Sequence, residues 1–116
     1  MNGSERAEKV DWQEQWRILF PLTVFTHACW TAHFGVDINI VDYVWETYHE
    51  VCLLRHPSHL LLILYFLKVY PTGEVIAAKF GISIASAFRI IWDGLERLAY
   101  HLQEVRPFFY QFAESL

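Results

Sequence analysis

Four side chains of the kind that bind metals are spaced along one stretch of the sequence at intervals of three, four and three residues: His49, Cys52, His56 and His59. On one continuous helix this spacing places all four on the same face, and zinc accepts imidazole and thiolate ligands. Pro57, however, interrupts any helix between the last two histidines. We therefore interpret the four residues as core and boundary side chains with local hydrogen bonds, and a zinc site is the less favoured alternative.

The other residues that could do chemistry give weaker signals. His27, Cys29 and His33 are close in sequence, but their spacing fits a metal site less well. Either cysteine of the chain could act as a nucleophile beside a histidine, yet the sequence offers no third group to orient such a pair and no oxyanion-binding turn. We therefore expect a protein that is not an enzyme, with no catalytic residue, no metal or other cofactor and no small-molecule substrate.

Five tryptophans and an acidic stripe are further candidates. Aromatic rings that stack on single-stranded nucleic acid are interleaved with Lys and Arg, whereas these tryptophans have mostly acidic or apolar neighbours, so packing in a core or an interface is favoured. Asp42, Glu46 and Glu50 recur every four residues and predict a solvated helix face, with a landing site for a basic partner as the alternative. The tryptophans are Trp12, Trp16, Trp30, Trp45 and Trp92.

The composition favours a single domain with surplus apolar surface. Of 116 residues, 54% are hydrophobic and 17% aromatic, so we expect a contiguous exposed patch of the kind that marks a partner or self-association surface. The net charge of −4 excludes a strongly basic nucleic-acid binder, and DNA contact requires a local basic patch. With two cysteines and no secretory signal, we expect an intracellular protein. The apolar run Leu60–Leu67 is far shorter than the ~20 residues of a membrane span, so we expect no membrane partner.

Caps and breakers divide the chain into five to six predicted helices, all in one helical domain. Residues 1–57 hold the N-terminal helices, 58–106 the helix-turn-helix core, and 107–116 an aromatic tail. The β-branched residues around Val36–Val41 leave a short strand as an alternative there. The predicted helices run from Ser4 to Pro21, over Leu22–Phe34, from a cap at Asp37 or Asn39 to about Leu54, over His59–Tyr70, over Gly73–Phe80, and from Ile84 to about Val105.

The connection between the last two predicted helices is the most informative segment. Gly81 can take the left-handed conformation that ends a helix, Ile82 can fill the core, and Ser83 can cap the long helix that follows. A short helix, a glycine turn and a long helix in this order are typical of a DNA-binding helix-turn-helix. Any two helices joined at a corner produce the same pattern.

At these residues the chain resembles the N-terminal helix-turn-helix region of PIF/Harbinger-type DDE transposases. The resemblance implies a nuclear DNA-binding-type domain. The family's nuclease domain, with its three metal-binding acids, follows this region and has no room here, so the resemblance implies a fragment or a domesticated descendant without nuclease activity. The matching elements are Leu60–Tyr70, Pro71-Thr72, Val75-Ile76, Phe80-Gly81-Ile82-Ser83 and Arg89-Ile90-Ile91, with Phe34-Gly35-Val36-Asp37 upstream.

On the DNA-binding interpretation, the last helix enters the major groove of double-stranded DNA. Arg89 then reads a base edge with Ser86 and Ala85 beside it, while Lys79 and Arg97 contact phosphates. The family tends to place basic and hydroxyl residues at the first groove-facing positions, where this chain is mostly apolar. The expected binding is therefore weak and sensitive to salt.

The alternative interpretation assigns the same helix to protein contacts. Ile84 and Phe88 are expected on its solvent side, and the spare aromatics Trp92, Phe108 and Phe109 enlarge the apolar surface. Aromatic residues are enriched at the centres of protein interfaces. This interpretation predicts a homodimer or an adaptor module with another protein partner, which keeps the fold and has lost most DNA affinity.

Overall fold

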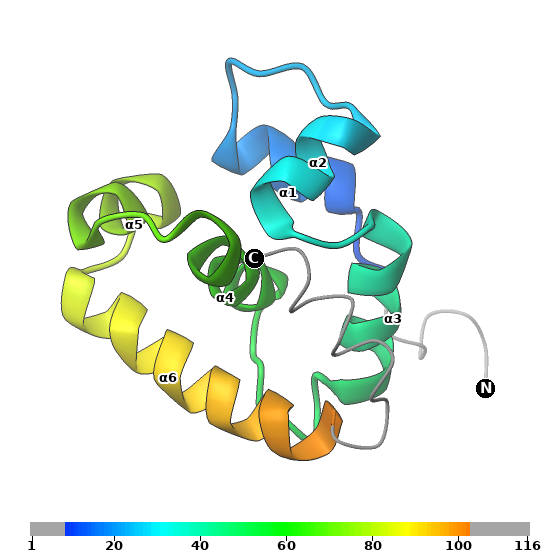
Figure 1. Ribbon diagram of the computed structural model, residues 1–116, viewed down its shortest axis with the longest axis vertical. Helices are drawn as coiled ribbons and strands as arrows, with labels where there is room; N and C mark the ends of the chain where they lie inside the picture. The colour runs from blue at the N-terminus through cyan, green and yellow to red at the C-terminus, as the bar shows by residue number, and fades with distance from the viewer. Residues whose placement is uncertain (1–8, 103–116) are drawn as a thin grey trace.

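The computed structural model describes residues 9–102, and this part of the chain folds into six helices without a strand (Figure 1). The predicted all-α class is therefore confirmed, and the strand considered at Val36–Val41 is not formed, because most of that segment is helical. Ser4, Phe108 and Phe109, the candidate cap and interface residues, lie outside the described part. The helices are α1 (Trp12–Leu19), α2 (His27–Phe34), α3 (Ile38–Tyr48), α4 (Pro57–Val69), α5 (Gly73–Phe80) and α6 (Ile84–His101).

The N-terminal half contains less helix than the sequence pattern predicts. α2 begins only at His27, because the Thr26 hydroxyl accepts a backbone N–H of the first turn at 3.0 Å and caps the helix there. α3 ends at Tyr48 rather than near Leu54. After it the chain turns, and Leu53 adopts a left-handed φ of +58°. A left-handed conformation costs a leucine about 1–2 kcal/mol. The residue type at position 53 therefore does not predict the turn.

The last three helices begin within two residues of their predicted starts, whereas α6 ends at His101 rather than near Val105. His56 starts α4 slightly earlier than expected, because its ring nitrogen accepts the Ser58 N–H at 3.1 Å. Gly81, with φ +69°, ends α5, and the Ser83 hydroxyl accepts the Ser86 N–H at 3.1 Å to begin α6. The two helices meet at 94°. An angle of this size is shared by helix-turn-helix units and by other helical corners.

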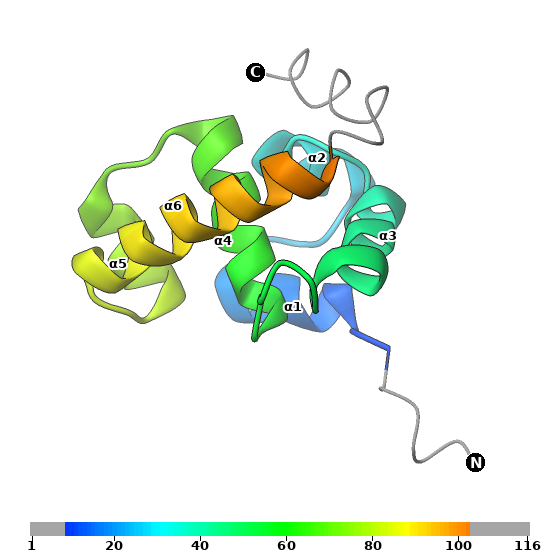
Figure 2. The same ribbon diagram turned by 90° about the horizontal axis from the view of Figure 1, so that it is seen from below.

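α4 is the central helix of the fold. Its residues from Leu60 to Tyr65 are all buried, as expected for a helix that is apolar nearly all round. Figures 1 and 2 show α4 surrounded by the other helices, with α6 lying across it. Within residues 9–102 no single helix has the length and apolar composition to cross a bilayer. α5 and α6 meet these two criteria only when they are treated as one segment across the bend between them.

Aromatic rings fill the core between α1, α2 and α3. Trp16 is fully buried and stacks on Phe20 with ring centroids 4.3 Å apart. Trp12 Nε1 donates to the Asp42 carboxylate at 2.9 Å and joins α1 to α3. Core packing is thus confirmed for four tryptophans, whereas Trp92 lies on the surface. The four buried tryptophans are Trp12, Trp16, Trp30 and Trp45.

A glycine lets α6 approach α4 closely. Gly94 is buried, and a Cβ atom added to it would lie 2.3 Å from Ile63 Cδ1 and 3.7 Å from Leu54 Cδ2. Ordinary contacts between carbon atoms are about 3.5–4.0 Å, so no larger residue fits without movement. This approach holds one side of α6 against both α4 and the connection between α3 and α4.

Candidate functional site

A groove beside α6 brings together three arginines from two separate segments. α6 contributes Arg89 and Arg97, and the α3–α4 connection, which lies beside the C-terminal half of α6 in Figure 1, contributes Arg55. The groove has a volume of about 400 Å³, a size in the range of ligand sites. We call it the basic groove. The other lining residues are Cys52, Leu53, Leu54, His59, Ile90, Asp93 and Gly94.

The basic groove is electropositive although the chain as a whole is acidic. Its lining includes three arginines but a single carboxylate, that of Asp93. The ion pairs formed within residues 9–102 are Lys9–Asp42 and Arg17–Glu14, so Arg55, Arg89 and Arg97 have no carboxylate partner in this part of the chain. Their planar forks of N–H donors therefore remain free to bind an anion from solution.

His59 lies on the wall of the basic groove, in the first turn of α4. Its pKa is lowered from the ordinary value of 6.5, first by burial and then by the neighbouring positive charges of His56 and Arg55. The ring is therefore mostly neutral at neutral pH. The same charges that disfavour its protonation also attract an anion to the groove.

Cys52, the thiol beside this groove, has no feature of a nucleophile. It is buried, and burial raises the pKa of the thiol, which Arg97 opposes only in part. Reactive cysteines have lowered pKa values and partial exposure instead. The thiol thus stays protonated at neutral pH.

The histidine and cysteine clusters form local contacts. The His49 ring nitrogen lies 2.6 Å from the Trp45 carbonyl oxygen, and His33 Nδ1 lies 2.8 Å from the Cys29 carbonyl oxygen. His56 caps α4. Among residues 9–102, no three His, Cys, Asp or Glu side chains are arranged to hold a metal ion.

The residues predicted to contact DNA fall into three groups. Arg89 and Arg97 lie together in the basic groove, and Ala85 is exposed at the start of α6, where Ser86 is half-buried. Lys79 points elsewhere: its Nζ lies 3.4 Å from the carbonyl oxygen of Leu19 at the end of α1 and 4.2 Å from the Phe20 ring centroid.

Arg55 is the groove residue that sequence reasoning missed. It lies in the irregular connection after α3, where no periodic pattern relates it to a helix face. It lines the same groove as Arg89 and Arg97 only because α6 packs against α4. A single arginine beside a helix-breaking proline gives no signal from which this could be inferred.

An aromatic cluster covers the other side of α6. The Phe66 ring of α4 lies 5.8 Å from Tyr70, 5.9 Å from Phe88 and 5.8 Å from Trp92, measured between centroids. Trp92 is 58% exposed, Tyr70 64% and Ile84 41%. Phe88, expected on the solvent side, is half-buried because it packs against Phe66. We call Phe66, Tyr70, Ile84, Phe88 and Trp92 together the aromatic face.

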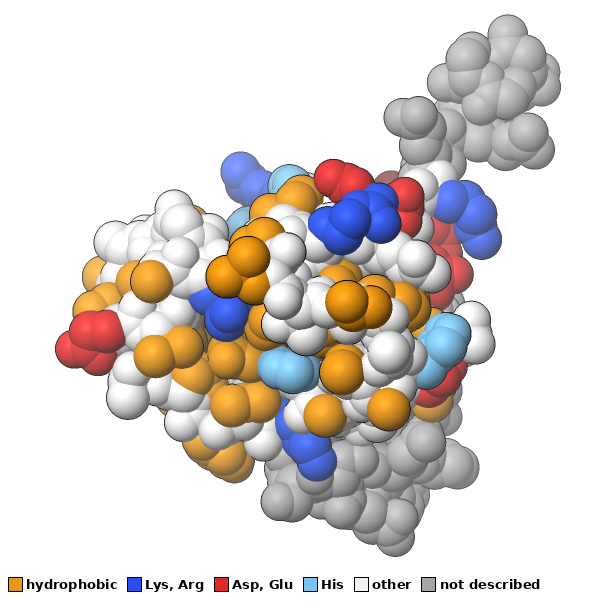
Figure 3. Space-filling view, turned by 90° about the horizontal axis from the view of Figure 1, so that it is seen from above, with side chains coloured by type: hydrophobic (Ala, Val, Ile, Leu, Met, Phe, Trp, Pro, Cys, Tyr) orange, Lys and Arg blue, Asp and Glu red, His pale blue; other side chains and the backbone are white. Residues whose placement is uncertain are grey.

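A second group of exposed apolar residues lies at the α1–α2 connection. Ile18, Leu22 and Val24 are all largely exposed there. Figure 3 views the molecule from the end that carries this connection and shows hydrophobic side chains spread between a few single charged ones. Exposed apolar side chains are thus present, as expected from composition, but they are spread over several elements, since Tyr43, Val51, Leu53 and Tyr100 are also more than half exposed.

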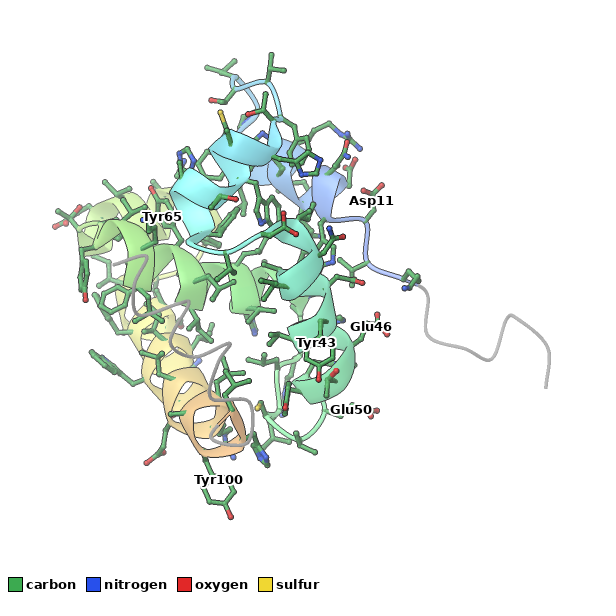
Figure 4. The ribbon with its side chains drawn as sticks, turned by 45° about the vertical axis from the view of Figure 1, so that its right-hand side comes forward. Asp11, Tyr43, Glu46, Glu50, Tyr65 and Tyr100 are labelled. Atoms are coloured by element: carbon green, nitrogen blue, oxygen red, sulfur yellow. The ribbon has the colours of Figure 1, made fainter. Side chains whose placement is uncertain are left out.

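The predicted acidic stripe of Asp42, Glu46 and Glu50 is only partly a solvated helix face. Glu46 is exposed on α3, Glu50 is exposed in the turn after α3 ends, and both point outward (Figure 4). Asp42 is half-buried and accepts the Trp12 indole N–H. It therefore has a structural role, which the periodic pattern did not reveal.

No family model, no curated protein and no solved structure matches this chain.

Proposed function

We propose that this chain is a non-enzymatic, nuclear DNA-binding domain of the helix-turn-helix type, derived from a transposase. One observation carries the proposal. Arg89 and Arg97 of α6 lie with Arg55 around one groove, and none of the three has a carboxylate partner within residues 9–102. This is the local basic patch that an acidic chain requires for contact with nucleic acid.

The shape of the α5–α6 pair supports the same proposal. Helices of DNA-binding pairs cross at about 90–120°, and α5 and α6 meet at 94°. In such pairs the N-terminal part of the second helix contacts base edges. On α6, Ala85 and Arg89 are exposed in this part, and an arginine can bind a guanine through two hydrogen bonds.

The phosphate contacts come from the basic groove. Arg55 and Arg97 bind backbone oxygens in this proposal, whereas Lys79 is engaged with α1. Two such contacts correspond to a slope of about −2 for the logarithm of the binding constant against the logarithm of salt concentration. The proposed binding is therefore weak, and its affinity falls as salt rises.

Alanine substitutions on α6 test this proposal. In about 50 mM salt, the protein is expected to bind mixed-sequence duplex DNA, measured by fluorescence anisotropy. Arg97→Ala should weaken binding to all sequences and reduce the salt slope by about one. Arg89→Ala should in addition lose preference at one base position, worth about 1–3 kcal/mol.

Arg17→Ala is the matched control. Arg17 is an exposed arginine of α1 that pairs with Glu14 at 2.6 Å, outside the groove. Its replacement should leave duplex binding unchanged. Absence of duplex binding at low salt, or an equal loss in the control, contradicts the proposal.

Homodimerisation is the second candidate function, and the aromatic face favours it. Tyr70 and Trp92 both contact Phe66, yet more than half of each side chain is exposed. Large aromatic residues in such clusters are typical of interface centres. A dimer of this kind also fits DNA binding, since paired helix-turn-helix units read two half-sites.

Sedimentation equilibrium tests the dimer. The wild-type chain should sediment as a dimer, and Ile84→Glu or Trp92→Glu should make it monomeric with an unchanged helical circular dichroism spectrum, because a buried unpaired carboxylate opposes association. Tyr100→Glu is the control: Tyr100 is 71% exposed and points away from the far end of α6 (Figure 4). A wild-type monomer at high concentration rules out this dimer.

A further inference from the structure

We infer that the basic groove is a phosphate-binding site in which His59 takes up a proton when the phosphate group enters. The inference rests on the proposed function only for the source of the phosphate. The shared chemistry is a tetrahedral anion, which either a DNA backbone or a free phosphate supplies.

The lining of the groove selects an anion. Its three arginines line the groove from two segments: Arg55 from the α3–α4 connection, and Arg89 and Arg97 from α6. Guanidinium groups match phosphate oxygens with paired hydrogen bonds. Asp93, between Arg89 and Arg97 on α6, is the one lining carboxylate and the one group that opposes an anion.

His59 is the group in this groove whose protonation can respond to a bound anion. On the side of the α3–α4 connection its neighbours are Arg55, His56 and Cys52. On the side of α6, the residues that line the same groove are Arg89, Asp93 and Arg97. Burial and nearby positive charge lower the pKa of His59 in the free protein. A bound phosphate offsets that positive charge and accepts a hydrogen bond from the imidazolium, which raises the pKa again.

The sign of the pH dependence follows from this linkage. Because the pKa of His59 is lowered in the free folded protein, the neutral ring supports folding above pH 6.5 and this contribution is lost as pH falls through the lowered value. Because the pKa is higher in the complex, phosphate binding takes up a proton. Phosphate therefore binds more tightly as pH falls through the interval between the two values.

A histidine titration followed by NMR tests the site with sulfate as the probe. Sulfate is a tetrahedral dianion that does not itself titrate between about pH 5 and 8, where histidine does. Relative to sodium chloride of equal ionic strength, sulfate should raise the pKa of His59 by about one unit. That shift equals about tenfold tighter binding to the protonated form. The His27 ring, on α2, should give the same resonances in both salts.

Two substitutions in the groove have opposite expected effects. Arg97→Gln should abolish the sulfate-dependent shift of His59, because it removes a guanidinium. Asp93→Asn should enlarge it, because it removes the opposing carboxylate. Both side chains are exposed, so the fold should persist, which circular dichroism checks. Arg17→Gln, outside the groove, should leave the shift unchanged.

A parallel titration with duplex DNA distinguishes the two sources of phosphate. If the duplex also raises the pKa of His59 and binds more tightly at about pH 6 than at about pH 8, and Arg97→Gln removes both effects, the backbone is the source. If sulfate shifts His59 but no duplex binds, the phosphate site stands and the proposed DNA-binding function fails. If His59 responds to neither sulfate nor bound duplex, the phosphate site is overturned while DNA binding stands.

Discussion

Trp16→Ala is expected to lower the free energy of unfolding by about 3–5 kcal/mol. Trp16 is fully buried, and its ring contacts Phe20 and lies 5.3 Å from the His33 ring. Its Nε1 also donates to the Thr23 carbonyl oxygen at 3.0 Å, which holds the α1–α2 connection against α1. Small domains are stable by only about 5–15 kcal/mol. The variant should therefore be largely unfolded, or melt far below the wild type.

Urea unfolding followed by circular dichroism measures this loss, with Tyr100→Ala as the control at an exposed aromatic residue outside the aromatic face. Tyr100 is 71% exposed, so its truncation removes little buried area and should cost about 1 kcal/mol or less. Trp16→Phe keeps much of the ring but leaves the Thr23 carbonyl without its donor, which should cost about 1–3 kcal/mol. Equal losses in the two alanine variants contradict this account of the core.

Gly94→Ala is expected to destabilise the protein by about 1–3 kcal/mol, although alanine is the better helix former by about 1 kcal/mol. The new Cβ would overlap Ile63 Cδ1 of α4. Since Ile63 is fully buried, its side chain has little room to move. α6 must shift instead, which displaces Arg89 and Arg97 from Arg55, and duplex binding should weaken along with stability.

A double variant tests whether this single contact is the cause. Ile63→Val removes the Cδ1 atom, so Gly94→Ala combined with Ile63→Val should be more stable than Gly94→Ala alone, by a coupling of about 0.5–3 kcal/mol. Gly73→Ala is the control. Its Cβ would lie 3.0 Å from a side-chain methyl of Ile84, which is 41% exposed and can move. Simple additivity of the two core substitutions would falsify the contact explanation.

The corner between α5 and α6 illustrates what local sequence can predict. Thr72 caps α5, Gly81 ends it and Ser83 caps α6. Each of these interactions joins residues within four positions of one another, so residue type and order are enough to locate it. The left-handed turn at Leu53 is different. Leucine does not favour that conformation, so only packing around it stabilises the turn.

Only part of the candidate site could be predicted from the sequence. Arg89 and Arg97 lie eight positions apart on one predicted helix, so their common side follows from helical geometry. Lys79 was expected beside them, but its ammonium group lies against the Phe20 ring of the α1 end. The position of the Lys79 side chain depends on where α1 packs, and no sequence pattern near Lys79 indicates this packing.

By itself, the amino-acid order determined the helical class, the central position of the apolar α4 and the break at Gly81, because periodicity and capping act over one or two helical turns. The three-dimensional packing decided that Arg55 completes a groove with Arg89 and Arg97, and that Lys79 turns to α1 across 60 residues of chain. The groove depends on how α6 crosses α4 at Gly94, and the position of Lys79 depends on where α1 packs. Both are contacts between segments far apart in sequence, which only the folded chain brings together.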